Sequence, residues 1–152
     1  MKFEVHQSVG AIIIDGDDCV LQVRDNKDGV LWPGKIHYWG GAVEPDDESS
    51  PEKAILRELK EELDIDLREV DLVPFHRMSV AYNNPDNKHG EMSVHLYIAN
   101  LTTRRALHAY EGSNIFRLNK NYLVSELDSL EITPYLHEAL IGLRDYFEKY
   151  YE

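Results

Sequence analysis

The stretch at residues 40–65 reads GGAVEPDDESSPEKAILRELKEELDI, a glycine pair followed by a polar connector and a helix with marked ends. Ser50 is a favourable N-cap residue, and Pro51 suits the first helical position because its missing N–H would have no partner there. Apolar side chains then recur at helical spacing: Ile55, Leu56, Leu59 and Leu63. Asp64 follows the last of them. The pattern predicts a helix from Pro51 to about Leu63 with one face on the core.

Three glutamates stand on another face of this predicted helix. Glu58, Glu61 and Glu62 are at positions i, i+3 and i+4, so their side chains project from one side. Like charges this close repel, although Arg57 and Lys60 could soften the repulsion. Two alternatives stay open at this point: an ordinary solvated helix face, or a set of carboxylates that holds a divalent metal ion.

The overall composition is that of a globular domain with an acidic excess. The chain has 152 residues, enough for one domain with a real core, and we predict a single domain over 1–152. Its net charge of −12 argues against a nucleic-acid-binding surface, which needs clustered Lys and Arg. A phosphorylated small molecule stays compatible with this charge if a metal cation supplies the positive charge.

Cysteine content and hydropathy bear on the location of the protein. Cys19 is the only cysteine, so an intrachain disulfide and a cysteine metal cluster are excluded. The early apolar run, residues 9–14, is too short for a signal-peptide core or a membrane span. We therefore expect a cytoplasmic protein with no membrane partner.

Outside the helix, strand patterns dominate both halves of the chain. Residues 8–25 hold two β-branched, apolar runs around an Asp-Gly-Asp-Asp turn, which is typical of a β-hairpin. Further strand patterns occupy 70–82, 91–101 and 115–118. Thr133 is a suitable N-cap for a terminal helix. The apolar stripe of that helix comprises Leu136, Leu140, Leu143, Phe147 and Tyr150. A mixed sheet between helical layers, in the α/β class, accommodates this order of elements.

Residues 40–65 resemble the signature of the Nudix hydrolases, G-x5-E-x7-R-E-U-x-E-E-x-G-U, in which U is an apolar residue. The order of the flanking strands and the terminal helix is also similar to that family. The resemblance implies a Nudix-type α/β/α sandwich with a central mixed β-sheet. It also implies hydrolysis of a nucleoside diphosphate linked to another group, with Mg²⁺ or Mn²⁺ as cofactor. Many members of the family are homodimers, which makes a homodimer one expectation here.

The resemblance carries roles to individual residues. Glu58, Glu61 and Glu62 match the family's metal-binding glutamates, and Gly41 matches the glycine whose backbone carbonyl often joins them. Arg57 matches the arginine that orients these glutamates. The expected metal site is therefore Gly41, Glu58, Glu61 and Glu62, and Glu61 and Arg57 are expected to be catalytic.

The connector before the helix departs from the family pattern. Six residues, rather than five, separate Gly41 from Glu48, and eight, rather than seven, separate Glu48 from Arg57. Aligning the helix start puts a two-residue insertion in EPDDES, and Ser49 then falls where a loop glutamate is expected. Three carboxylates could substitute for that glutamate: Glu44, Asp47 and Glu48. At the other end of the helix, Asp64 replaces the glycine of the signature, and Asp tolerates a left-handed backbone better than most residues.

Several residues outside the signature are candidates for the site. Glu111 lies in a late loop where many Nudix enzymes carry a general base or an additional metal ligand, and the alternative is an exposed loop glutamate. Glu91 is a weaker candidate of the same kind. The arginines that could clamp phosphate are Arg24, Arg77, Arg104 and Arg105. The aromatic residues that could either stack on a base or close the core are Trp32, Tyr38 and Trp39.

The leading functional hypothesis is a metal-dependent pyrophosphohydrolase acting on a small nucleotide, either a nucleoside triphosphate or a sugar nucleotide such as ADP-ribose. The alternative is a catalytically weak or silent nucleotide sensor, a role that Nudix-like domains play inside regulators. The lengthened connector favours the sensor, whereas the complete glutamate set favours the enzyme. An isoprenoid diphosphate isomerase is disfavoured because that version of the fold relies on a catalytic cysteine, and Cys19 lies in an early strand away from the signature.

Overall fold

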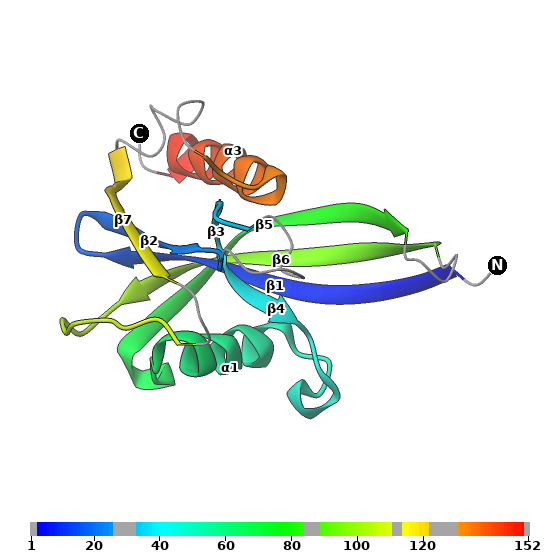
Figure 1. The fold of residues 1–152 in the computed structure, drawn as a ribbon, viewed down its shortest axis with the longest axis horizontal. Helices are drawn as coiled ribbons and strands as arrows, with labels where there is room; N and C mark the ends of the chain where they lie inside the picture. The colour runs from blue at the N-terminus through cyan, green and yellow to red at the C-terminus, as the bar shows by residue number, and fades with distance from the viewer. Residues whose placement is uncertain (1–2, 26–32, 84–88, 111–113, 122–130, 151–152) are drawn as a thin grey trace.

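A computed structural model describes residues 3–25, 33–83, 89–110, 114–121 and 131–150. The chain folds into three layers, in which a β-sheet lies between helix α1 on one face and helix α3 on the other (Figure 1). The predicted α/β/α sandwich with a central mixed sheet is therefore confirmed.

The elements follow the order that the sequence patterns predict. The strands are β1 (Phe3–Asp15), β2 (Asp18–Val23), β3 (Ile36–His37), β4 (Trp39–Ala42), β5 (Val70–Asn83), β6 (His89–Leu101) and β7 (Asn114–Asn119). The helices are α1 (Pro51–Leu63) and α3 (Pro134–Tyr150), with two short 3₁₀ helices, η1 (Pro45–Asp47) and η2 (Leu67–Glu69). The predicted hairpin, the later strands and both helices each have a counterpart close to the predicted bounds.

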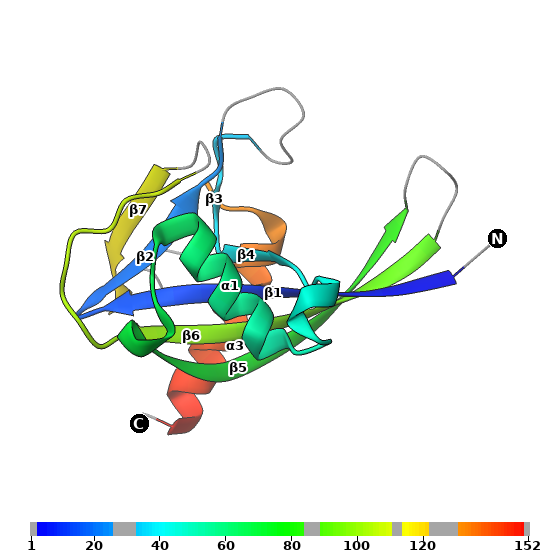
Figure 2. The ribbon, with the colours of Figure 1, turned by 90° about the horizontal axis from the view of Figure 1, so that it is seen from below.

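The sheet is mixed because one central pairing is parallel. Its order is β3-β2-β1-β6-β5, while β4 also pairs with β1 and β7 with β2. In the parallel β1–β6 pair, Val9 lies opposite His95 and Ile13 opposite Ala99. The other pairings are antiparallel. Beyond α1, strands β1, β5 and β6 continue together as a projecting ribbon (Figure 2).

The hairpin predicted at the start of the chain is formed by β1 and β2. Ile13 lies opposite Val20 and Asp15 opposite Asp18, and Gly16 closes the turn with a left-handed φ of 64°. Cys19 is buried in the core beneath α3, on the face of the sheet opposite α1.

Each face of the sheet carries its own hydrophobic core. Neighbouring residues of β1 point to opposite faces, so Ile13 belongs to the core beneath α1 and Ile12 to the core beneath α3. The buried helix residues in these cores are Ile55, Leu59 and Leu63 of α1 and Leu136, Leu140 and Leu143 of α3. Both predicted stripes therefore face the sheet, although the side chain of Tyr150 lies outside the described residues.

The start of α3 is tied to β3 through one buried hydroxyl. Thr133 Oγ1 accepts a hydrogen bond from the Leu136 backbone N–H at 3.1 Å, which confirms the predicted N-cap. The same oxygen lies 2.6 Å from His37 Nδ1. Burial, assisted by the Arg24 charge, lowers the pKa of His37 to about 3. His37 is therefore neutral, and the tautomer of its ring decides whether Nδ1 or the Thr133 hydroxyl donates this hydrogen bond.

Across the described part of the chain, we find no helix with the length and apolar character needed to cross a membrane.

Candidate functional site

Helix α1 has the ends that its sequence predicts. The Ser50 hydroxyl accepts a hydrogen bond from the Lys53 backbone N–H at 3.2 Å. At the other end, Asp64 adopts φ 55° and ψ 37°, the left-handed conformation that usually favours glycine at this place. The Lys60 ammonium donates to Asp64 Oδ1 at 2.6 Å. The helix thus ends normally although the glycine of the signature is absent.

Arg57 is held from the connector by a two-point ion pair. Its Nε donates to Asp47 Oδ1 and its Nη2 to Asp47 Oδ2, both at 3.0 Å. Nη2 also donates to the backbone carbonyl of Ala42 at 3.0 Å. Asp47 is buried, and the Arg57 guanidinium holds the pKa of this carboxyl below its usual range. Both Arg57 and the connector are therefore fixed before any ligand arrives.

Of the three carboxylates considered as substitutes for the loop glutamate, Asp47 is the one that makes this pair. Five residues separate it from Gly41, as in the signature, so the two additional residues fall after it. These are Glu48 and Ser49, which both adopt left-handed conformations, with φ of 53° and 61°. Glu48 pairs with Lys53 at 2.7 Å instead. Two successive left-handed residues thus accommodate the longer connector between η1 and α1.

The remaining nitrogen of Arg57 lies among three carboxylates. Nη1 is 3.0 Å from Glu58 Oε1, 3.2 Å from Glu61 Oε2 and 3.8 Å from Glu44 Oε1. Burial raises the pKa of Glu58, and the negative charges of Glu61 and Glu44 add to the effect, whereas Arg57 opposes it. One guanidinium thus faces four carboxylates when Asp47 is included, which leaves an excess of negative charge at this place.

Gly41 is where β4 comes closest to the helix glutamates. A Cβ atom placed on it would lie 2.5 Å from Glu58 Oε1, so the Glu58 carboxylate would have to shift from its present position. The absence of a side chain therefore allows the Glu58 carboxylate to rest directly against the backbone of β4. Glycine at this position is explained by that close approach.

The oxygen atoms gathered here fit a hard divalent cation. Mg²⁺ and Mn²⁺ prefer oxygen ligands such as carboxylates and backbone carbonyls. The excess negative charge at this place also favours a cation. Within the described residues, no group of three His, Cys, Asp or Glu side chains is already arranged around a single metal position. Arg57 Nη1 instead holds Glu58 and Glu61 together.

Glu62 occupies a more enclosed position than Glu61. It is 9% exposed, whereas the Glu61 side chain is 47% exposed. The Glu62 backbone carbonyl accepts a hydrogen bond from the Tyr110 N–H at 2.9 Å, a contact that no sequence pattern indicated. Glu111, the candidate general base, lies outside the described residues.

The other candidate polar residues make contacts elsewhere. Arg77 Nε donates to Ser93 Oγ at 2.7 Å between β5 and β6, and Glu91 accepts from the Ser79 hydroxyl at 2.5 Å on the same ribbon. Arg105 Nε pairs with Glu69 at 2.9 Å. Arg104 lies in a surface hollow beside the β1–β2 turn, and the charge of Arg24 acts on His37.

The aromatic candidates that the structure describes belong to the core. Trp39 is fully buried and its indole N–H donates to the Val20 carbonyl at 3.0 Å. Tyr38 is also buried, on the α3 face, where its ring fills the space left by Gly10. Trp32 lies outside the described residues. Neither Trp39 nor Tyr38 is therefore exposed for stacking on a base.

Comparison with solved structures finds the same fold in several proteins. A dihydroneopterin triphosphate pyrophosphohydrolase of E. coli matches with a TM-score of 0.67 and 15% identity, over 90% of this chain and 92% of that one. The NUDIX domain of Shewanella oneidensis NrtR, crystallised with ADP ribose, matches with a TM-score of 0.65 and 12% identity, over 91% and 86%. An ADP compounds hydrolase matches with a TM-score of 0.64 and 18% identity, over 95% and 74%.

The sequence comparisons give the family. No curated protein sequence matched this chain. The model of the NUDIX domain family, however, matches residues 4–127, a range that includes the connector, helix α1, strands β2 to β7 in full and β1 except for Phe3. The chain therefore belongs to the NUDIX domain family, whose enzymes hydrolyse diphosphate bonds.

Proposed function

We propose that this Nudix hydrolase is a divalent-metal-dependent pyrophosphohydrolase acting on a small nucleotide. Its substrate is a nucleoside diphosphate linked to another moiety, either a nucleoside triphosphate or a sugar nucleotide such as ADP-ribose. The observation that carries the proposal is the arrangement of Glu58 and Glu61 around one nitrogen of Arg57, with Glu58 resting on the backbone of Gly41.

Mg²⁺ or Mn²⁺ is the proposed cofactor. The Gly41 carbonyl and the carboxylates of Glu58, Glu61 and Glu62 would hold it. When bound, such an ion neutralises diphosphate charge, polarises phosphorus and lowers the pKa of a coordinated water. The surplus of carboxylates over cations at Arg57 supports this donor set, because a bound cation would offset their mutual repulsion.

The protein's own residues prepare this site. Asp47 fixes the guanidinium of Arg57 at two points, and Arg57 in turn restrains the Glu58 and Glu61 side chains. Because their motion is already restrained, these carboxylates lose less side-chain conformational entropy when they bind a ligand. Glu111 is the proposed general base, and it follows Tyr110, whose backbone N–H donates to α1 at Glu62.

The substrate class is proposed from the relatives. The NrtR domain was crystallised with ADP ribose, and the other two structures belong to proteins that act on ADP compounds and on a pteridine triphosphate. A heterocyclic organic group that carries at least two linked phosphates is common to these ligands. The cytoplasmic location, the homodimer and the absence of nucleic-acid or membrane partners stay predictions.

Turnover assays on a substrate panel test the proposal. Nucleoside triphosphates, ADP-ribose, other sugar nucleotides and dinucleoside polyphosphates are each incubated with Mg²⁺, Mn²⁺ or EDTA. Reactions on ADP-ribose, other sugar nucleotides and dinucleoside polyphosphates are read with and without added phosphatase, which releases phosphate only from their monoester products. Reactions on nucleoside triphosphates are read with and without inorganic pyrophosphatase, because phosphatase would attack the triphosphate itself. We expect metal-dependent turnover of one class and none in EDTA. If no substrate turns over while ADP-ribose still raises the melting temperature, the chain is a nucleotide sensor.

A further inference from the structure

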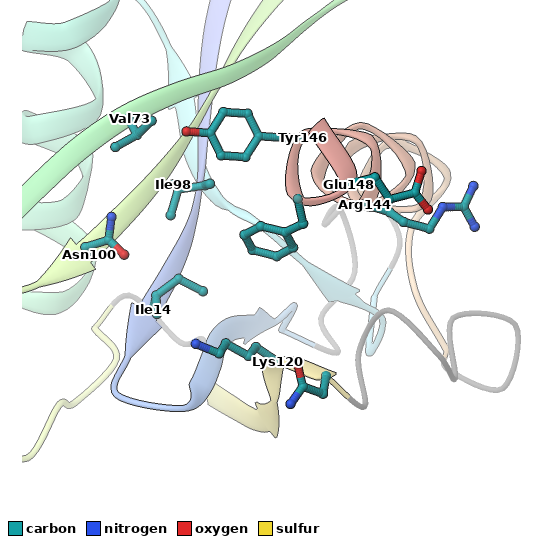
Figure 3. A pocket seen from close by; sticks show the side chains of 10 residues that line it. Ile14, Val73, Ile98, Asn100, Lys120, Arg144, Tyr146 and Glu148 are labelled. Atoms are coloured by element: carbon teal, nitrogen blue, oxygen red, sulfur yellow. The ribbon is translucent and has the colours of Figure 1, made fainter. Parts of the chain in front are cut away.

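A cavity of about 530 Å³ lies on the α3 face of the sheet, beside the C-terminal half of that helix (Figure 3). Three strands supply one wall through Ile14, Val73 and Ile98, and α3 supplies the other through Tyr146 and Phe147. The volume falls within the range of roughly 300–1,000 Å³ that is typical of small-molecule sites. No residue of 40–65 lines it, so it is separate from the candidate metal site on the other face of the sheet.

The apolar walls of this cavity are only partly covered by the protein. Ile98 is buried, but Ile14, Val73, Tyr146 and Phe147 keep part of their surface accessible while packing against the core beneath α3. Burying that surface under an apolar ligand would be favourable, in proportion to the area removed from water. The walls therefore suit a molecule with a hydrocarbon or aromatic body.

One cation projects along the edge of the apolar walls. Lys120 directly follows β7, and its backbone N–H donates to the Asp17 carbonyl at 2.9 Å, which fixes its position. Its side chain extends toward Ile14 in Figure 3. The nearby carboxylates pair with Arg117 instead, Asp15 at 2.9 Å and Asp18 at 3.7 Å. As far as the described residues go, no carboxylate forms a salt bridge with the Lys120 ammonium.

The other charges at the rim offset one another. Arg144 and Glu148 stand one turn apart on α3 and extend away from Val73 and Ile98 in Figure 3. Among the described residues that line the cavity, Lys120 therefore dominates the charge that a ligand on the apolar walls would meet. Asn100 adds an amide group at the end of β6 that can hydrogen-bond to a polar ligand.

We propose that this cavity binds a small monocarboxylate with an aromatic or branched hydrocarbon body. The body covers the apolar walls, and the carboxylate accepts a charge-assisted hydrogen bond from the Lys120 ammonium. Because the whole chain carries a net charge of −12, attraction of an anion to this place depends on the local positive charge of Lys120. This ligand differs from the proposed substrate, since one negative charge matches one lysine without a metal ion.

A matched pair of probes tests the proposal on the full-length chain. 2-Naphthoate carries the carboxylate, and 2-naphthalenemethanol has the same ring system without the charge. Each is titrated while backbone amide NMR shifts and calorimetric heats are recorded. We expect saturable binding of naphthoate, at least about tenfold tighter than binding of the alcohol. The shifts should concentrate around Ile14, Val73, Ile98 and the C-terminal half of α3.

Three variants make the test specific to the lysine. Lys120→Met should weaken naphthoate binding about tenfold or more and leave the alcohol unchanged, whereas Lys120→Arg should retain most of the affinity. Lys35→Met, which removes an exposed lysine paired with Glu131, is the matched control and should change neither. Metal-dependent nucleotide turnover and the melting temperature report that each variant is folded.

Three outcomes would overturn the proposal. The first is equal affinity of the wild type and Lys120→Met for naphthoate. The second is a set of amide NMR shifts centred on α1. The third is the absence of saturable binding up to about 10 mM naphthoate, above which binding is too weak to be specific. None of these outcomes bears on nucleotide hydrolysis, which is measured separately. The failure of this proposal and the failure of the proposed function are therefore distinguishable.

Discussion

Asp47 and Arg57 are joined by two parallel hydrogen bonds of 3.0 Å, one from Nε and one from Nη2. This pair links the connector to the helix that carries the glutamates. Because Arg57 also donates to Glu58 and Glu61, the loss of Asp47 would affect the placement of both carboxylates.

Replacing Asp47 with Asn should lower both stability and activity. The substitution removes the charge and one acceptor while leaving a buried side chain of similar shape, which should cost about 1–3 kcal/mol in free energy of unfolding. Urea denaturation and turnover measure the two effects. Asp46→Asn, at the exposed neighbouring position, is the control and should stay close to wild type. Equal behaviour of the two variants would contradict the role given to Asp47.

Glu61→Gln should reduce turnover by roughly 100-fold or more while leaving the fold intact, because it removes the charge of a proposed metal ligand from a half-exposed side chain. Mn²⁺ affinity, followed by the EPR signal of the free ion, should fall in parallel. The matched control is Glu52→Gln, an exposed glutamate in the first turn of the same helix. Unchanged turnover and unchanged Mn²⁺ affinity in Glu61→Gln would remove Glu61 from the metal site.

Gly41→Ala should impair activity through a steric conflict. The new Cβ would lie 2.5 Å from Glu58 Oε1, so either the carboxylate or β4 must move. Adding Glu58→Asp shortens the opposing side chain and should relieve the conflict. Thermal unfolding gives the shift in melting temperature of each variant. We therefore expect the double variant to melt at a higher temperature than the sum of the two single-variant shifts would give. Strict additivity would show that the two residues do not meet.

Stability should fall as the pH is lowered from about 7 toward 4, partly through His37. Its pKa is about 3 in the folded protein and near 6.5 when unfolded, so below 6.5 the unfolded state binds a proton that the folded state does not. The contribution is on the order of a few kcal/mol by pH 4. His37→Gln should flatten the dependence of the urea midpoint on pH, whereas the exposed His108→Gln should not.

The parts of the fold that could be predicted depend on local chemistry. Ser50 and Pro51 mark a helix start wherever they occur before an apolar stripe, and the Asp-Gly turn between β1 and β2 marks a hairpin for the same reason. Both ends of α1 and the start of α3 therefore lie where the sequence placed them. Asp64 shows that a residue departing from the family signature can still be interpreted correctly from its backbone preference.

The site was harder to predict because its contacts join distant segments. The choice of Asp47 over Glu48 depends on two left-handed residues, Glu48 and Ser49, which are not residue types that favour this conformation strongly. The buried indole of Trp39 donates its hydrogen bond to Val20, nineteen positions away in the chain. The contact between Tyr110 and Glu62 has no local pattern at all.

The parallel pairing of β1 with β6 has a consequence for how the chain acquires this structure. Ile14 lies opposite Asn100, so the centre of the sheet joins positions separated by 86 residues. During synthesis the β1–β2 hairpin can form early, but its long inner edge has no partner until the chain has emerged beyond residue 100. Folding should accordingly be slow for a domain of this size, because distant segments must meet first. Until then, that exposed edge is the part of the nascent chain most open to incorrect association with other chains.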